Sequence, residues 1–309
     1  MTDNAVRTPH MRARTADQHR IGWRAPPEPG RPPDVRDLDA SDSTVDPQRT
    51  PLVSCLMPTY DRRAFVPQAV SYFLRQDYPA KELIIVDDGP EPVNDLLPAD
   101  PRIAYHRLET RTVLGAKRNL ACDLARGPII MHWDDDDWAS PDRVSIQVAA
   151  LTSGDADICG TSSLLCYDLA NASAWRFTWS DRRHPWVAGT SLCFRKEFWS
   201  RFPFPDVAIG EDTHFVFNPS VRGVTDVRGS GCIVALIHRD NTVHKPVHRA
   251  NWSPCPSREV EDLLGEDLAF YRRLRECLWP GHNAANSVSA ANDATSPQEE
   301  AVSIPAPLE

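Results

Sequence analysis

A run of four consecutive aspartates at residues 134–137 is the feature of this sequence that points most directly to chemistry. The run directly follows the mostly apolar residues 129–133 and precedes Trp138. A run of charges is usually solvated, but carboxylates packed at a strand end repel one another unless a cation lies among them. Oxygen ligands without a nearby cysteine suit Mg²⁺ or Mn²⁺. The run therefore predicts a site for one of these divalent ions.

Polar residues also follow two other segments that we predict to be buried strands. Thr59, Tyr60 and Asp61 follow residues 52–57, and Asp87-Asp88 follows residues 83–86. In an open parallel sheet, ligands bind outside the carboxyl ends of the strands. Each cluster alone is weak evidence, because such residues are common in turns. Together with the aspartate run they predict a single crevice.

Two cations, Lys117 and Arg118, lie near the start of a predicted helix, after Gly115. Positive charges at this end oppose the helix dipole, so a stabilising role is not expected. A contact with a phosphate group explains them, and a solvated first turn is the alternative.

Short apolar runs alternate with segments of helical periodicity through the first half of the chain. Strands are predicted at 52–57, 83–86, 103–108, 129–133 and around Ile158, with helices at 65–74, 115–125 and 141–151. This alternation predicts an α/β fold with a mostly parallel, Rossmann-like sheet flanked by helices. The second half is less regular, with strand-like segments at 190–194 and 232–237 and an amphipathic helix at 258–278.

Composition narrows the class of protein. The 309 residues carry a net charge of −9, which argues against a general nucleic-acid binder. No apolar run approaches the roughly 20 residues of a membrane span, and the N-terminus lacks the apolar core of a signal peptide. The eight cysteines lack a CxxC pair, so reduced thiols in a cytoplasmic protein are expected.

The composition is uneven along the chain. Residues 1–50 hold seven of the 28 prolines, and residues 280–309 contain no lysine or arginine. Both ends are expected to be disordered tails, and residues 51–279 a single folded domain.

Together, the motifs of this sequence resemble those of glycosyltransferase family 2. Their order along the chain and their spacing match the family pattern, as do their residue types. The matching residues are Pro58-Thr59-Tyr60-Asp61-Arg62, Val86-Asp87-Asp88-Gly89, Gly115-Ala116-Lys117-Arg118-Asn119, Asp134-Asp135-Asp136-Asp137-Trp138 with Pro141, and Gly210-Glu211-Asp212. The resemblance covers about residues 51–240. It implies the GT-A fold and an inverting enzyme that uses a nucleotide-activated sugar and a divalent metal. It also implies a nucleotide-binding half (51–140), an acceptor half (141–250) and a C-terminal helix (257–279).

The resemblance assigns nucleotide contacts to the first half. Thr59, Tyr60, Asp61 and Asp88 would hold the base and ribose. Lys117 and Arg118 would face the ribose or diphosphate.

The family's DxD motif corresponds to Asp134 and Asp136. Asp134 would lie near the ribose, and Asp136 would bind the metal that bridges the diphosphate. His132 and Trp133 depart from the small or aliphatic residues usual before this motif, which leaves the donor open. His238 would complete the metal shell or contact the diphosphate, with a surface histidine as the alternative; His244 and His248 are weaker candidates.

Inverting transfer requires a carboxylate that accepts the proton of the attacking hydroxyl. The resemblance assigns this role to Asp212, with Glu211 orienting the acceptor or its loop. The first turn of a helix is the alternative interpretation of this pair. A second Gly-Glu-Asp, at 265–267, is expected on the solvent face of the C-terminal helix. Trp186 is a candidate for stacking on an acceptor sugar.

The leading hypothesis is a metal-dependent transfer of a sugar from a UDP-, dTDP- or GDP-sugar to a hydroxyl of a glycan, lipid-linked or small-molecule acceptor. Nucleic acid is not an expected partner, and peripheral association with the inner face of a membrane stays open. A nucleotidyltransferase would need a glycine-rich loop after the first strand, which residues 58–63 do not provide. An inactive binding module would lack Asp136 or Asp212, and both are present.

Overall fold

The computed structural model describes residues 50–278 and is built on two sheets. The predicted tails, apart from Thr50, lie outside the described residues. The larger sheet has the order β10-β6-β9-β4-β1-β2-β3. Its strands are β1 (Val53–Thr59), β2 (Lys81–Asp87), β3 (Ile103–Arg107), β4 (Ile129–His132), β6 (Ile158–Gly160), β9 (Cys193–Arg195) and β10 (Val224–Asp226). Strands β1 to β4 are parallel where they pair, and β9 runs antiparallel between β4 and β6.

Helices cover both faces of this sheet. Alternate residues of β1 face opposite sides, so Cys55 packs with one apolar core and Leu56 with another. The first core includes α1 (Val66–Leu74) and α3 (Arg143–Thr152). The second includes α2 (Leu114–Leu124), α4 (Lys196–Arg201) and α5 (Glu211–Val216). The prediction of an α/β fold on a mostly parallel sheet flanked by helices is confirmed.

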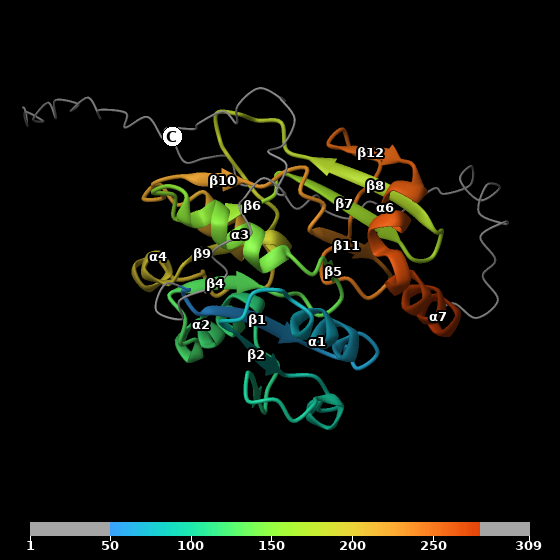
Figure 1. Cartoon of the computed structure of the whole chain (residues 1–309), viewed down its shortest axis with the longest axis horizontal. Helices are drawn as coiled ribbons and strands as arrows, with labels where there is room; N and C mark the ends of the chain where they lie inside the picture. Colours follow the sequence, from blue (N-terminus) through green and yellow to red (C-terminus); the bar gives the residue numbers. More distant parts are fainter. Residues whose placement is uncertain (1–49, 279–309) are drawn as a thin grey trace, which may run out of the picture.

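A smaller five-stranded sheet was not predicted. Its order is β12-β8-β7-β11-β5. The strands are β5 (Trp138–Ala139), β7 (Ser163–Asp168), β8 (Ser173–Thr178), β11 (Ile233–Ile237) and β12 (Trp252–Cys255). Figure 1 shows it beside the larger sheet. Because β5 begins directly after Asp137 and pairs with β11, the aspartate run forms the passage from one sheet to the other.

The sequence prediction was wrong at two places in the second half. Residues 190 and 191 belong to a short 3-10 helix, η3 (Gly189–Ser191), and the strand starts only at Cys193. The single C-terminal helix is interrupted: α6 (Ser257–Leu264) and α7 (Leu268–Leu278) flank a 3-10 turn, η4 (Gly265–Asp267). Gly265 has a φ of 53°, which favours glycine and breaks the helix.

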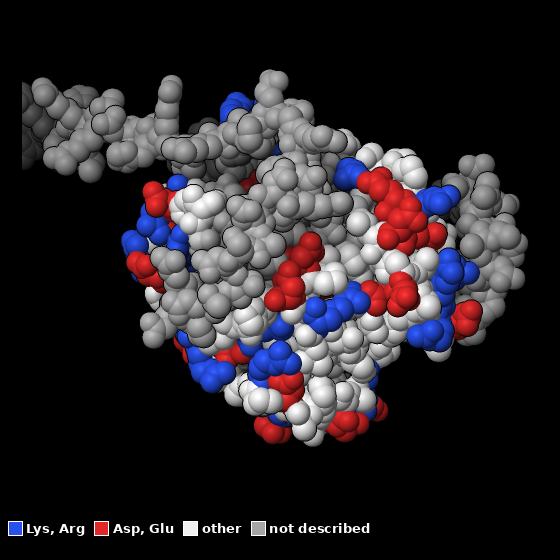
Figure 2. Space-filling model, in the orientation of Figure 1, with Lys and Arg blue, Asp and Glu red and all other residues white. Residues whose placement is uncertain are grey.

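The surface carries mixed charge. On the face drawn in Figure 2, acidic and basic side chains of the described residues are interspersed. Among residues 50–278, no helix is both long and apolar enough to cross a bilayer.

Candidate active site

The ends of β1, β2 and β4 open into a cleft of about 1370 Å³. Parallel pairing sets Thr59 beside Asp87 and Leu56 beside His132, so the residues that follow each strand converge at one edge. The predicted site residues that line the cleft are Tyr60, Asp61, Asp88, Lys117, Arg118, Asp134, Asp136, Glu211 and Asp212. Thr59 and His238 are buried behind them. The predicted crevice is therefore present in the structure.

At one end of the cleft, Lys117 and Asp88 form a buried ion pair. Lys117 Nζ lies 2.6 Å from Asp88 Oδ1 and also donates to the carbonyl of Thr59. The backbone N–H of Thr112 donates to the other oxygen of Asp88, at 2.7 Å. Lys117 is therefore not a solvated first-turn residue. It joins the ends of β1 and β2 to α2.

The neighbouring wall is formed by Tyr60 and Asp61. The guanidinium of Arg111 stacks 3.7 Å from the centre of the Tyr60 ring. Asp61 has a φ of 54°, a left-handed conformation that is uncommon outside glycine. A Cβ at Gly89 would lie 2.7 Å from the backbone nitrogen of Asp61, so only glycine allows this close approach.

Arg118 joins the two predicted halves of the site. It is buried, pairs with Glu211 at the start of α5, and lies 3.6 Å from Asp134. Burial raises the pKa of Glu211, although the charge of Arg118 opposes this rise. The Gly-Glu-Asp motif is thus both the first turn of a helix and part of the cleft.

Within the aspartate run, two members have structural partners. Asp137 accepts hydrogen bonds from the Leu236 backbone N–H of β11 (2.9 Å) and from Thr190 Oγ1 of η3 (2.5 Å). Asp135 lies 3.8 Å from Arg62. Burial and the negative charge of Asp136 raise the pKa of Asp135 to about 8 and that of Asp137 to about 7.

Asp136 is the member held in its ionised form. Burial alone would raise its pKa, but the hydrogen bond from His238 and nearby positive charges bring the pKa down to about 2. His238 Nε2 donates to Asp136 Oδ2 at 2.9 Å, and Asn241 Nδ2 lies 3.4 Å from the same oxygen. The His238 ring stacks on Phe65 and is fully buried, so the interpretation as a surface histidine is wrong.

These residues fit a divalent ion that substrate helps to coordinate. In the described part of the chain, no three His, Cys, Asp or Glu side chains form a ready metal cage. Mg²⁺ commonly binds through one or two carboxylates plus substrate phosphates, with water in the remaining positions. Asp136 supplies an ionised carboxylate, and the adjacent His238 keeps Nδ1 buried without a partner among these residues. This donor set suits a metal–diphosphate complex better than a metal bound by protein alone.

The candidate base, Asp212, lies against η3. Its Oδ1 accepts the backbone N–H of Thr213 at 2.7 Å. A Cβ at Gly189 would lie 1.7 Å from Asp212 Oδ2, so η3 leaves room for this carboxylate only because residue 189 is glycine. The Gly189 carbonyl in turn accepts Nδ1–H of His132, at 2.8 Å. Burial lowers the pKa of His132 well below its ordinary value, so this ring is neutral.

Sequence reasoning missed two residues that hold this arrangement. Lys245 lines the cleft, and despite burial its pKa is raised by the charges of Asp137 and Asp136. Arg143 is fully buried and donates to the carbonyls of His132 and Thr190, at 2.6 and 2.8 Å. Its position one residue after Asp142, at the start of a predicted helix, carried no signal of this role.

The fold and the cleft define an α/β protein whose polar cleft lies at the carboxyl ends of parallel strands. Residues 54–204 match the model of Glycosyl transferase family 2. This part of the chain is a glycosyltransferase family 2 domain, and the resemblance seen in the sequence is confirmed. The mostly parallel α/β sheet expected with that family is the larger sheet described above.

Two curated relatives have names that refer to polysaccharide synthesis. The putative colanic acid biosynthesis glycosyl transferase WcaA of Escherichia coli (strain K12) is 39% identical over 107 residues, 33% of this chain and 38% of the relative. The putative teichuronic acid biosynthesis glycosyltransferase TuaG of Bacillus subtilis (strain 168) is 33% identical over 103 residues, 32% of this chain and 41% of the relative. The match thus spans about two fifths of each relative's length.

Two solved structures are similar at the level of the backbone. The mannosyltransferase PcManGT from Pyrobaculum calidifontis, in complex with GDP-Man and Mn²⁺, gives a TM-score of 0.48 at 19% identity, over 62% of this chain and 58% of that one. S. aureus TarS 1–349 in complex with UDP-GlcNAc gives a TM-score of 0.47 at 13% identity, over 73% of this chain and 74% of that one.

Proposed function

We propose that this protein is a metal-dependent, inverting glycosyltransferase that moves a sugar from a nucleotide-sugar to a hydroxyl of a glycan, lipid-linked or small-molecule acceptor. The nucleotide is a uridine, thymidine or guanosine diphosphate. One arrangement carries this proposal: the ionised Asp136 beside His238 shares a cleft with Asp212 and with the buried Asp88–Lys117 pair.

The donor is bound at the ends of the parallel strands. Thr59, Tyr60, Asp61 and Asp88 hold the base and ribose, with Asp134 near the ribose. Lys117 and Arg118 lie on the diphosphate side. Asp136 and His238 hold Mn²⁺ or Mg²⁺, which when bound offsets the charge of the leaving diphosphate.

Asp212 acts on the acceptor. Its carboxylate accepts the proton of the acceptor hydroxyl while that oxygen forms the new bond to C1 of the sugar and the bond to the diphosphate breaks. Glu211, paired with Arg118, orients this part of the cleft. Attack from the face opposite the leaving group inverts the configuration at C1.

A panel of nucleotide-sugars tests the proposal. With Mn²⁺ and the full chain, we expect slow release of nucleoside diphosphate from one donor type, and no release when a chelator is present. Release from every donor alike, or release that the chelator leaves unchanged, would contradict it.

The base assignment has a test of its own. We expect Asp212→Asn to keep donor affinity, because the amide can still accept from Thr213, and to slow release about 10²- to 10⁴-fold. Asp262→Asn, an exposed carboxylate on α6, is the matched control and should leave the rate unchanged. A near-normal rate in Asp212→Asn would place the base elsewhere.

The proposed localisation is the cytoplasm. Peripheral association with the inner face of the membrane is compatible with this proposal. Reduced cysteines support this setting: no disulfide joins Cys55, Cys122, Cys159, Cys166, Cys193, Cys232, Cys255 and Cys277.

A further inference from the structure

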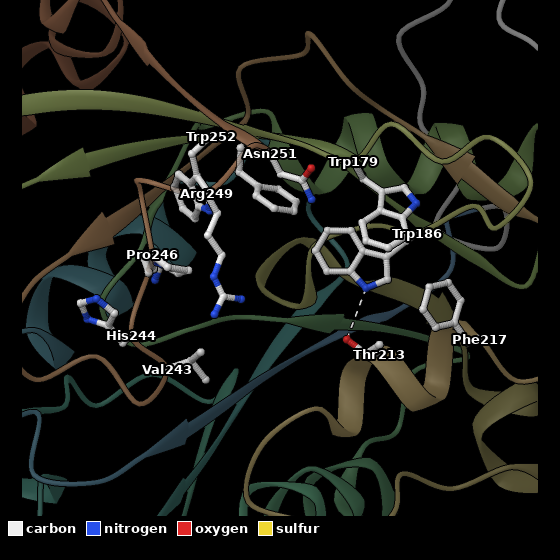
Figure 3. A pocket seen from close by; sticks show the side chains of 12 residues that line it. Trp179, Trp186, Thr213, Phe217, Val243, His244, Pro246, Arg249, Asn251 and Trp252 are labelled. Atoms are coloured by element: carbon white, nitrogen blue, oxygen red, sulfur yellow. Dashed lines mark hydrogen bonds between the residues drawn. The ribbon is translucent and has the colours of Figure 1, made fainter. Parts of the chain in front are cut away.

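A second pocket, of about 250 Å³, opens beside the donor cleft, and five of its twelve lining residues are phenylalanine or tryptophan (Figure 3). The rings form a continuous wall, with successive centroids 5.4 to 6.0 Å apart. In order along the wall they are Trp252, Phe177, Trp186, Trp179 and Phe217. They come from β12, β8, the loop after β8 and the end of α5.

These rings are not ordinary core residues. All five are only partly buried, and the pocket exposes their apolar surface. The indole N–H of Trp179 donates to the His184 carbonyl at 2.8 Å, so its polar edge is already satisfied. A concave patch of exposed aromatic rings is typical of a binding site. The ring faces are negative and attract the weakly positive C–H groups on one side of a sugar ring.

The pocket is tied to the candidate base. Trp186 Nε1 donates to Thr213 Oγ1 at 3.4 Å, and Thr213 directly follows Asp212 (Figure 3). Trp186, Thr213 and Lys245 line both the pocket and the donor cleft. A molecule that stacks on the aromatic wall therefore lies beside Thr213, the residue that follows Asp212, whereas Asp88 lines the donor cleft and not this pocket.

The pocket also has a positive side. Arg249 lines the pocket, and in Figure 3 its side chain extends along the side formed by Pro246 and Val243. No carboxylate lines the pocket, and among residues 50–278 none pairs with Arg249. His244 lies on the same rim. An anionic group on the ligand would meet a guanidinium whose charge the described residues leave unneutralised.

We propose that this pocket is the acceptor subsite and that it takes a pyranose ring carrying an anionic group, either a carboxylate or a phosphate. The ring stacks on the aromatic wall, and the anionic group binds Arg249. This assignment rests on the proposed glycosyltransferase function and narrows its acceptor to an acidic sugar.

Binding of simple methyl glycosides to the full chain tests the assignment without a donor. The panel pairs methyl glucuronide, galacturonide and mannuronide with the neutral parent of each, and adds the 6-phosphates of the same parents. Dissociation constants come from tryptophan fluorescence or saturation-transfer NMR. We expect at least one anionic member to bind about fivefold more tightly than its neutral parent, the gain of a partly exposed ion pair. The uronate and phosphate arms distinguish the two anions.

Substitutions locate the effect. Arg249→Gln should remove the preference for the anionic member, whereas Arg273→Gln, which removes an exposed charge from α7, should keep it. Trp252 lines this pocket and not the donor cleft, so Trp252→Leu should weaken anionic and neutral members alike by about three- to tenfold.

Three results would overturn the assignment: no panel member binds, anionic and neutral members bind equally, or Arg249→Gln keeps the preference. Metal-dependent nucleotide release from the donor panel is measured in parallel. Release without sugar binding rejects the acceptor subsite alone, whereas absence of release from every donor rejects the glycosyltransferase function itself.

Discussion

Replacing Gly189 by alanine should disable the candidate base while leaving the fold intact. A Cβ at this position would lie 1.7 Å from Asp212 Oδ2, and real Cβ atoms do not approach other heavy atoms within 3.0 Å. The carboxylate must therefore move by at least 1.3 Å, the difference between these two distances. A displacement of about 1 Å in a reacting group can cost about 100-fold in rate.

The cost to folding should be small. The atoms in the way belong to the end of the Asp212 side chain, which is only partly buried and can rotate aside. Gly189 lies in η3 and has no positive φ, so alanine adopts its backbone conformation. A Gly→Ala change at such a position alters the free energy of unfolding by less than about 1 kcal/mol.

The assay compares release of nucleoside diphosphate, donor affinity and thermal unfolding in four variants. We expect Gly189→Ala to lose about 100-fold in rate with donor affinity and melting temperature unchanged. Gly154→Ala, where a Cβ meets nothing within 4 Å, is the matched control and should retain the wild-type rate. The double variant with Asp212→Asn should be no slower than Asp212→Asn alone, because both changes act on one group. A rate within threefold of wild type in Gly189→Ala, or fully additive losses in the double variant, would refute the reasoning.

Three further substitutions test the rest of the site. Asp136→Asn should raise the dissociation constant for Mn²⁺, measured with bound donor, at least about 100-fold, and an unchanged constant would remove Asp136 from the metal site. Lys117→Met leaves the buried Asp88 carboxylate unpaired, so the free energy of unfolding measured by urea titration should fall by about 3 kcal/mol. A fall of less than about 1 kcal/mol would mean that the ion pair is not buried in solution. Asp267→Ala removes the acceptor of Arg75 and Trp138 and should lower the free energy of unfolding by a similar amount. The control, Glu266→Ala at the exposed neighbouring residue, should lower it by almost nothing. Equal losses in the two variants would contradict the contacts of Asp267 in η4.

Asp267 shows where sequence patterning fails. The amphipathic pattern of residues 258–278 places it on the solvent face, and this prediction was wrong. Because Gly265 breaks the helix, Asp267 turns inward and accepts from Arg75 at 2.6 Å and from Trp138 Nε1 at 2.8 Å. A pattern with a period of 3.6 residues carries no information about the direction of the chain after a break.

The part of the candidate site at the strand ends was predictable because its signals are local. Asp88 and Asp136 each follow an apolar strand, and parallel pairing brings such positions to one edge. The contact between Gly189 and Asp212 joins residues from different elements, and no local pattern encodes it. The smaller sheet was missed for a similar reason, since β5 has two residues and pairs with a strand almost a hundred positions later.

The aspartate run is a structural junction as well as a candidate metal site. Each of its four carboxylates has a partner from a different part of the fold: Arg118 on α2 for Asp134, Arg62 after β1 for Asp135, His238 after β11 for Asp136, and Thr190 on η3 with Leu236 on β11 for Asp137. Through η3 the same junction reaches the carboxylate of the candidate base. Burial and repulsion from Asp136 raise the pKa values of Asp135 and Asp137, and a cation at Asp136 would relieve the repulsion and strengthen their existing contacts. In the proposed mechanism, metal binding and the placement of the candidate base would therefore be coupled through the same few residues, and substitutions at this junction should alter both together.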